Sequence, residues 1–520
     1  MKLAVPRLFP FLATLALSAS AWCQTWERED VGFDNIQSRA RDLANKPYVA
    51  PNRDRLPEWM HKLTRDQYRD IHFNPNQALW ATDNLPFRAM FFHPGYLYPE
   101  PVTLNEFTSS HQQQIRLAEA YFNYGPSIQK HGELPPDGGF SGFRLHTPLN
   151  NPNNFDELIA FQGASSWRAL GKNQRYGISS RGIAVDTGID NVTEEFPSFR
   201  EFWLRKPAAD DTHARIYALL DGPSYTGAYA FTVHPGNETL VDVRAVIFTR
   251  RAVQRLGIAP MSSMFWFGEN SRRRFDDFHP EVHDSDGLAI RMGSGERLWR
   301  PISNDSGKLE LSTFNMEKCE GFGLLQRDRR PAAYEDVDAN YQLRPSLWIE
   351  PTSDWGSGRV ILIEIPSTQA FSENIVAMWE PSRLPQPGDR LEFAYQQHWT
   401  TMNPDPSQSG GYVVATRSGL LNAPPEQRII VVEFAGSNLS QPSTIPLTAD
   451  VKAVDAGADK IKIHDVTVQA MPEDRWRVTF QISPATQGAK LTETGPVEIR
   501  CCLKRGENFL TETWVHRVIP

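Results

Sequence analysis

Short runs in which hydrophobic and polar residues alternate dominate the chain from about residue 68 onward. A period of two is typical of β-strands with one buried face, and turn dipeptides such as Asp-Gly and Pro-Gly separate the runs. The pattern predicts an all-β, mainly antiparallel protein with few helices. The clearest runs are Ala214–Leu220, Gly227–Val233, Val241–Arg250, Arg359–Pro366 and Asn374–Pro381.

A helical period occurs only near the start of the chain. Between residues 31 and 63, the spacing of Ala40, Leu43 and Ala44 places them on one face of a helix. We expect this segment to be partly helical.

The C-terminal part has strand-like segments with sandwich-like spacing, and a polar, loop-like stretch at residues 400–411 precedes them. A chain of 520 residues is also longer than one core usually supports. We therefore expect a large β-sandwich over residues 24–402 and a small immunoglobulin-like β-sandwich over residues 403–520. The C-terminal segments are Arg428–Gly436, Lys460–Met471, Arg475–Ser483 and Gly495–Gly506.

Residues 1–23 resemble a secretory signal peptide. Lys2 and Arg7 give a positive start, Leu8–Ala19 is a short apolar run, and Ala19-Ser20-Ala21 is a small-residue cleavage pattern. An uncleaved anchor is the alternative, but the run is shorter than the roughly 20 residues that a membrane span needs. We expect the mature chain to be exported and soluble.

Net charge, aromatic content and cysteine usage narrow the classes of function that the chain can have. The net charge of −8, from 54 basic and 62 acidic residues, makes a nucleic-acid partner improbable. An aromatic fraction of 11% suits a protein that stacks against sugar rings. No CxxC or HExxH motif is present, and Cys319, Cys501 and Cys502 do not form a recognisable disulfide framework.

The densest polar stretch is Phe278–Leu288, which contains Glu281, His283, Asp284 and Asp286. Its Asp-Gly pair favours a tight turn. Its carboxylates also suit acid–base catalysis, and its carboxylates and histidine suit a metal, although the spacing of an EF-hand loop is not met.

A second polar region sets charged side chains beside Tyr341 and Trp348, as sugar-binding sites commonly do. The alternative is that residues 347–349 form a core strand. Glu373 directly precedes an apolar strand, a position at which a carboxylate is usually solvated.

Sequence blocks throughout the mature chain resemble the periplasmic glucan biosynthesis proteins G and D, known as OpgG/OpgD or MdoG/MdoD. The resemblance weakens beyond about Pro381. The main blocks are DQYRDIHF (66–73), FFHPGYLY (91–98), FQGASSWRALGKNQRYGISSRGIAVDT (161–187), EEFPSFREFWL (194–204), MFWFGENS (264–271), HPEVHDSDGL (279–288), GFGLLQRDR (321–329), LRPSLWIEP (343–351) and NIVAMW (374–379).

The resemblance implies a galactose-mutarotase-like large β-sandwich followed by an immunoglobulin-like domain. It also implies a periplasmic role in making osmoregulated glucans with a β-1,2-linked glucose backbone. Members of the D type resemble inverting endo-β-1,2-glucanases, and related members transfer the glucan chain. Neither a cofactor nor a metal is implied. Expected partners are the glucan, the inner-membrane glucan synthesis machinery and a second copy of the chain in a homodimer.

The same resemblance assigns roles to four residues. Asp284 matches the general base and Glu373 stands where the family has an aspartate as general acid. Tyr341 and Arg344 match residues near the chemistry. Because Glu373 is one methylene longer than the family residue, a catalytically weak glucan-binding or chain-handling protein is the alternative function.

We expect four further side chains to contact the substrate, namely Trp379, Trp348, Tyr334 and Asp286. We also expect Glu373 to lie in an apolar or charge-crowded setting, because either would keep a general acid protonated, with Phe371, Ile375 and Val376 as the apolar part.

Overall fold

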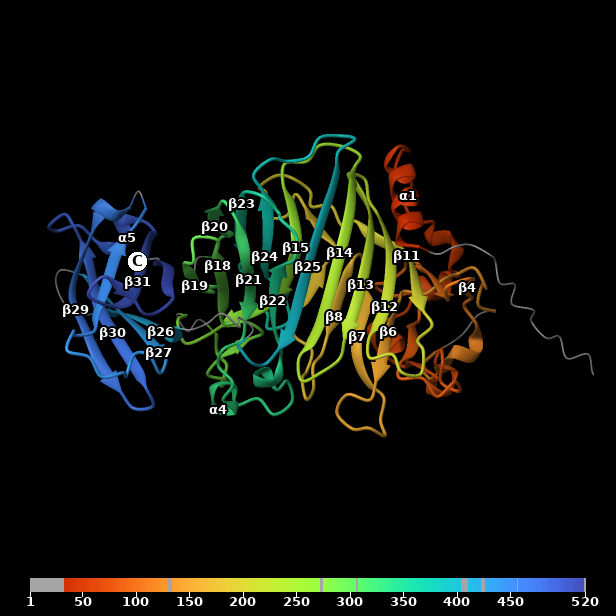
Figure 1. The fold of residues 1–520 in the computed structure, drawn as a ribbon, viewed down its shortest axis with the longest axis horizontal. Helices are drawn as coiled ribbons and strands as arrows, with labels where there is room; N and C mark the ends of the chain where they lie inside the picture. Colours follow the sequence, from red (N-terminus) through yellow and green to blue (C-terminus); the bar gives the residue numbers. More distant parts are fainter. Residues whose placement is uncertain are drawn as a thin grey trace, which may run out of the picture.

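The computed structural model describes residues 32–128, 133–271, 275–304, 307–403, 410–421, 426–455 and 457–518. The expected signal peptide, residues 1–23, lies outside these residues. In the described chain β-strands predominate, which confirms the all-β prediction (Figure 1). No helix in these ranges is long and apolar enough to cross a bilayer.

Ten strands of the described chain form one sheet, here called the ten-stranded sheet. Its neighbouring strands pair antiparallel, and β10 pairs with β15 beside the main order. In spatial order the strands are β2 (Arg88–Phe92), β6 (Gly142–Thr147), β7 (Asp156–Gln162), β8 (Ser166–Ala169), β9 (Ser179–Arg181), β15 (Leu256–Ser263), β24 (Ile375–Pro381), β23 (Gly358–Glu364) and β20 (Glu310–Met316), with β10 at Ile183–Val185.

A second sheet, here called the long sheet, contains fifteen of the described strands and runs through both parts of the chain. In order they are β28 (Thr448–Ala453), β31 (Val497–Arg505), β33 (Thr513–Val518), β19 (Arg297–Pro301), β18 (Gly287–Met292), β21 (Cys319–Leu325), β22 (Ser346–Pro351), β25 (Arg390–Thr400), β14 (Thr239–Thr249), β13 (Tyr225–His234), β12 (Ala214–Asp221), β11 (Ser198–Arg205), β3 (Thr103–Phe107) and β4 (Gln112–Ile115), with β32 (Asn508–Phe509) beside β31.

The remaining described strands form smaller sheets. They are β26 (Tyr412–Leu421), β27 (Gln427–Ala435), β30 (Arg475–Pro484) and β29 (Ile461–Met471) in a four-stranded sheet, β1 (Ile71–Phe73) with β5 (Phe122–Tyr124), and β16 (Phe265–Phe267) with β17 (Val282–His283). The helices are short: α1 (Phe33–Ala44), α2 (Glu58–His61), α3 (Arg65–Arg69), α4 (Pro331–Tyr334) and α5 (Leu491–Thr494), with 3-10 turns that include η4 (Tyr341–Leu343).

The α1 helix confirms the expected helical segment. Its face with Ile36 and Ala40 packs on Trp203, Ala228 and Val246, on the outer side of the long sheet. Figure 1 shows α1 at one end of the molecule and the C-terminal strands at the other.

Two hydrophobic cores follow from these sheets. The larger lies between the ten-stranded and long sheets and contains side chains such as Trp167, Phe231 and Trp399. The smaller lies in the C-terminal part, where the four-stranded sheet and β31 enclose Phe480 and Trp514. Parallel pairing of β19 with β33, for example Trp299 with Trp514, makes the long sheet continuous across both.

The buried amide of Gln397 joins the two sheets of the larger core. Its Oε1 accepts hydrogen bonds from the indole N–H groups of Trp167 (2.9 Å) and Trp399 (3.2 Å), and its Nε2 donates to Ser180 (2.9 Å). The residue has no exposed surface. A buried polar group is tolerated when all its partners are present, so this amide ties β25 to β8 and β9.

We expect Gln397→Leu to lower the free energy of unfolding by about 2–6 kcal/mol, because two buried indole N–H groups lose their acceptor at roughly 1–3 kcal/mol each. Urea denaturation followed by tryptophan fluorescence measures this. The neighbouring Gln396→Leu, whose side chain contacts Asp242 on the other face, is the control and should cost less than about 1 kcal/mol. Equal effects of the two changes would contradict the expectation.

Candidate functional site

Asp284 directly follows β17 and is held by contacts of both its backbone and its side chain. Its backbone N–H donates to the carbonyl of Met264 (2.8 Å), and the Arg344 guanidinium bonds to its carboxylate. Arg344 ends the 3-10 turn η4 and lies over the ring of Tyr341, 4.1 Å from the ring centre. The guanidinium therefore links the Asp284 carboxylate to the face of the Tyr341 ring.

Burial raises the pKa of Asp284, and the positive charges of Arg344, Arg168 and His283 oppose that rise. The carboxyl group is almost fully enclosed. Burial makes the carboxylate a stronger proton acceptor, and Arg344 favours its ionised form; both properties suit a general base.

Glu373 lies two residues before β24, and its side chain contacts β8 and β9 of the ten-stranded sheet. Its carboxylate forms an ion pair with Arg168 on β8 and accepts a hydrogen bond from the Ser179 hydroxyl on β9 (3.2 Å). The Glu373 side chain is 40% exposed, so a ligand on this face can reach it.

The expected apolar setting of Glu373 is wrong. Phe371 is 82% exposed, while Ile375 and Val376 are buried, in two different hydrophobic clusters. The carboxylate instead has the Arg168 guanidinium and the Ser179 hydroxyl as neighbours.

A shared strand anchors both carboxylate segments. Phe265 of β16 pairs with His283, directly before Asp284. The backbone of Phe265 also exchanges two hydrogen bonds of 2.9 Å with the side-chain amide of Asn374, directly after Glu373. Since both segments are fixed to one residue, their relative position is set by buried hydrogen bonds.

Gly177 brings the β8–β9 connection against Arg344. A Cβ atom at this position would lie 2.9 Å from two carbons of the Arg344 side chain, a contact that real Cβ atoms do not show. The backbone N–H of Arg175 also donates to the carbonyl of Leu343 (3.0 Å). The structure thus gathers Asp284, Arg344 and Tyr341 beside the strands that hold Glu373.

Three of the four expected substrate contacts are corrected, beginning with the two tryptophans. Trp348 and Trp379 are buried in the cores, at 1% and 0% exposure, and present no ring face to a ligand. Each ring lies over a glycine of the neighbouring strand, Gly321 and Gly358 respectively, where a Cβ would come within 2.4 Å of it. The alternative that residues 347–349 form a core strand is confirmed.

Tyr334 is the third correction, because its side chain has no surface open to a ligand, and Asp286 is engaged by backbone groups. The Tyr334 hydroxyl donates to the carbonyl of Asp328 (3.0 Å), and its ring packs edge-on against His283. The Asp286 carboxylate accepts from the backbone N–H groups of Arg327 and Asp328. Both residues shape the loop after β21, and Tyr334 is fully buried.

The side chains of Glu281, His283 and Asp286 place their donor atoms within 4.8 Å of one another, as a metal site would. The amide of Gln326 donates to the carbonyl of His283 (2.9 Å), so its oxygen accepts from Nδ1 of the imidazole (2.9 Å). Burial opposes protonation of His283, but Asp286 and Glu281 raise its pKa to about 9. An imidazolium that donates from both nitrogens favours a buried ion cluster over a metal ligand.

Sequence reasoning missed Arg168 and Ser179. Both occur in the block 161–187, and the alternation of β8 was a usable signal for Arg168, whereas Ser179 is buried in a strand without alternation. Their partner Glu373 is about 200 residues away, and nothing in local spacing reveals such a pairing.

Comparison with known proteins gives one consistent result. Residues 31–518 match the family model described as "Periplasmic glucan biosynthesis protein, MdoG". The chain is 40% identical over 498 residues to glucans biosynthesis protein G of Ralstonia nicotianae, covering 94% of this chain and 96% of the relative. The corresponding proteins of Rhodopseudomonas palustris and Dickeya dadantii are 41% and 38% identical, each covering over 90% of both chains.

We expect Arg344→Leu to destabilise the protein by about 3–5 kcal/mol at neutral pH, because it leaves the Asp284 carboxylate buried without its cation. The double variant Asp284→Asn with Arg344→Leu should recover much of that loss, since it removes the unpaired charge. Chemical denaturation of both single variants and the double variant measures the coupling. Simple addition of the two single effects would show that the pair is not energetically linked.

Glu269 gives a pH-dependent prediction. Burial, reinforced by Glu281, raises its pKa to about 8 despite the opposing Arg417. The folded state therefore binds a proton more tightly than the unfolded state, so its stabilising effect is present at acidic pH and is lost as the pH rises through 8.

Glu269→Gln should consequently be more stable relative to the parent at pH 8.5 than at pH 5. Urea denaturation at the two pH values measures the difference, with the exposed Glu335→Gln as control. A stability difference that does not change with pH would contradict the expectation.

Proposed function

This chain belongs to the MdoG family of periplasmic glucan biosynthesis proteins, and from that premise we propose that it acts on β-1,2-linked glucan as an inverting endo-glucanase or transglycosylase. The proposed reaction site contains Asp284 as general base and Glu373 as general acid. The observation that carries the proposal is that the segments of both carboxylates are anchored to Phe265. In addition, Arg168 pairs with Glu373 and its charge also acts on Asp284.

An inverting reaction needs two carboxyl groups in different roles. One protonates the leaving oxygen, and the other activates a water molecule on the opposite face of the sugar. The exposed Glu373 suits contact with the glycosidic oxygen, whereas the enclosed Asp284 suits deprotonation of a trapped water. Arg344 holds Asp284 in place and Tyr341 supports the Arg344 guanidinium.

Arg168 has a double role in this proposal. Its guanidinium occupies the Glu373 carboxylate, whereas a general acid must give its proton to the leaving oxygen. Binding of the glucan must therefore separate Glu373 from Arg168 before the leaving oxygen can be protonated. The freed guanidinium then faces the sugar hydroxyls as a donor.

The second candidate is a protein that binds and guides the glucan chain without turning it over. The contacts of Glu373 with Arg168 and Ser179 favour it, because they satisfy the carboxylate in the absence of a substrate. In either case the expected ligand is the glucan, and the membrane-bound synthesis machinery and a second copy of the chain are proposed partners.

The decisive experiment incubates purified protein with linear β-1,2-glucan and separates the products by size. We expect shorter chains from hydrolysis, or longer or cyclic chains from transfer. Glu373→Gln and Asp284→Asn should each reduce turnover by at least about a hundredfold while preserving glucan binding, since each removes one proton transfer. Glu373→Asp should retain or increase turnover.

Asp465→Asn, an exposed change in the C-terminal part, is the matched control and should behave as the parent protein. Binding without turnover by the parent would favour the second candidate. Full turnover by Glu373→Gln would remove Glu373 from the mechanism.

A further inference from the structure

The outer face of the ten-stranded sheet carries two rows of polar side chains. Along β8, Trp167 and Ala169 enter the core, so Ser166 and Arg168 both point outward. The first row joins Arg168 to Ser179 and Glu373. The second row is displaced from the first by two residues along each strand, a distance of about 7 Å. It contains Ser166 of β8 and Arg181 of β9, which pair across the two strands.

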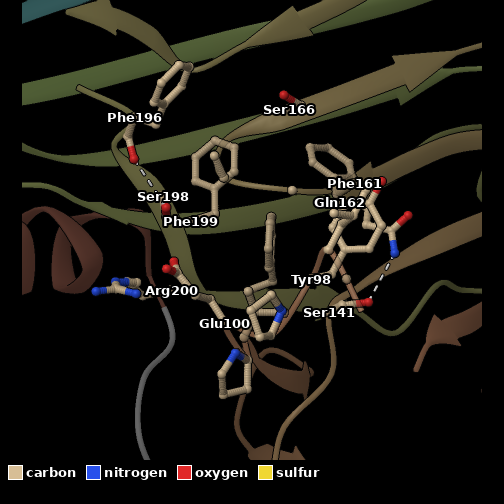
Figure 2. A pocket seen from close by; sticks show the side chains of 18 of the residues that line it. Tyr98, Glu100, Ser141, Phe161, Gln162, Ser166, Phe196, Ser198, Phe199 and Arg200 are labelled. Carbon is tan, nitrogen blue, oxygen red and sulfur yellow. Dashed lines mark hydrogen bonds between the residues drawn. The ribbon is translucent and has the colours of Figure 1, made fainter. Parts of the chain in front are cut away.

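A cavity of about 250 Å³ opens beside the second row (Figure 2). Gln162 of β7 and Ser166 of β8 form one wall, the segment around Tyr98 a second, and residues 196–200 a third. In Figure 2, Gln162 and Ser141 lie at one end of the cavity, and Phe196 and Arg200 lie toward the other. None of these residues belongs to the proposed reaction site.

The polar groups of this cavity are mostly neutral and fixed in orientation. The Gln162 amide N–H₂ donates to the hydroxyls of Tyr68 and Ser141 at 3.1 Å each. Its oxygen, which has no hydrogen bond among the described residues, is left as an acceptor. Ser141 in turn donates to the carbonyl of His93 (2.9 Å), which fixes the direction of the network.

Aromatic and apolar side chains complete the walls. Tyr98 packs against Tyr68 with ring centres 6.0 Å apart, which holds its ring at the cavity. Leu97 and Phe196 are 69% and 57% exposed at the mouth. A neutral sugar is usually bound by aromatic rings that contact its C–H groups and by amides and hydroxyls that hydrogen-bond to its O–H groups.

The cations near the cavity already have partners. Arg53 pairs with Glu100, and the Arg200 guanidinium donates to the Tyr48 hydroxyl and the Val49 carbonyl. Arg181 pairs with Glu194. Carboxylates thus neutralise Arg53 and Arg181, and Arg200 is engaged by neutral oxygens, which suits a neutral ligand rich in hydroxyl groups.

We infer that this cavity binds a glucosyl unit of the same glucan chain that reacts at Asp284 and Glu373, at a position remote from the bond that breaks. The inference rests on the proposed function. The two polar rows connect the cavity with Glu373 on one continuous face, so a single chain can contact both. Contacts remote from the reaction select long chains over short ones, because only a long chain reaches them.

The test measures binding by titration calorimetry in the Asp284→Asn background, which prevents turnover. The probes are a long linear β-1,2-glucan and a short β-1,2-linked oligosaccharide. Phe196→Ala removes one ring contact and Gln162→Leu removes one hydrogen-bonding group, so each should weaken binding of the long glucan by about tenfold. Binding of the short oligosaccharide should stay unchanged.

Phe509→Ala removes an equally exposed ring in the C-terminal part and is the control. Phe196→Ala changes a surface side chain, so it tests the inference even if Gln162→Leu fails to fold. Unchanged binding of the long glucan when Phe196→Ala is added to Asp284→Asn would overturn this inference alone, provided that the protein without the Asp284 change cleaves the glucan. Failure of the parent to bind either probe would overturn the proposed function as well.

Discussion

The alternation of side chains across the strands of the ten-stranded sheet is the constraint from which the site follows. Each strand must give its inward side chains to the core shared with the long sheet. On β8 this places Trp167 inside, in contact with the buried Gln397, and Arg168 outside. A shift of one residue would exchange the two, so core packing also fixes the register of the polar face.

The enclosed Asp284 is the costliest part of this arrangement. A buried carboxylate is tolerable only with a cation and hydrogen bonds close by, and Arg344 provides them. Gly177 is required for the same reason, because a side chain there would displace Arg344. The charge balance of the site thus depends on chain segments far apart in sequence, which makes it sensitive to changes that touch no ligand.

Much of the fold could be predicted from periodicity, and much of the site from motifs. Alternation correctly indicated the strands, and family resemblance directed attention to Asp284 and Arg344, which the structure places in contact. Trp348 was misjudged because a strand pattern does not reveal whether its outer face is covered by a second core, as here. The pairing of Arg168 with Glu373 is a product of tertiary folding, so neither motif nor period could disclose it.

The parallel pairing of β19 with β33 makes the C-terminal part a cap on an otherwise open sheet edge. Without that cap, β19 would expose unpaired backbone groups, and Trp299 and Trp348 would lose the apolar cover they share with Trp514. A chain that ended before β33 would then offer this edge for pairing between molecules. The C-terminal strands therefore act as edge protection for the long sheet.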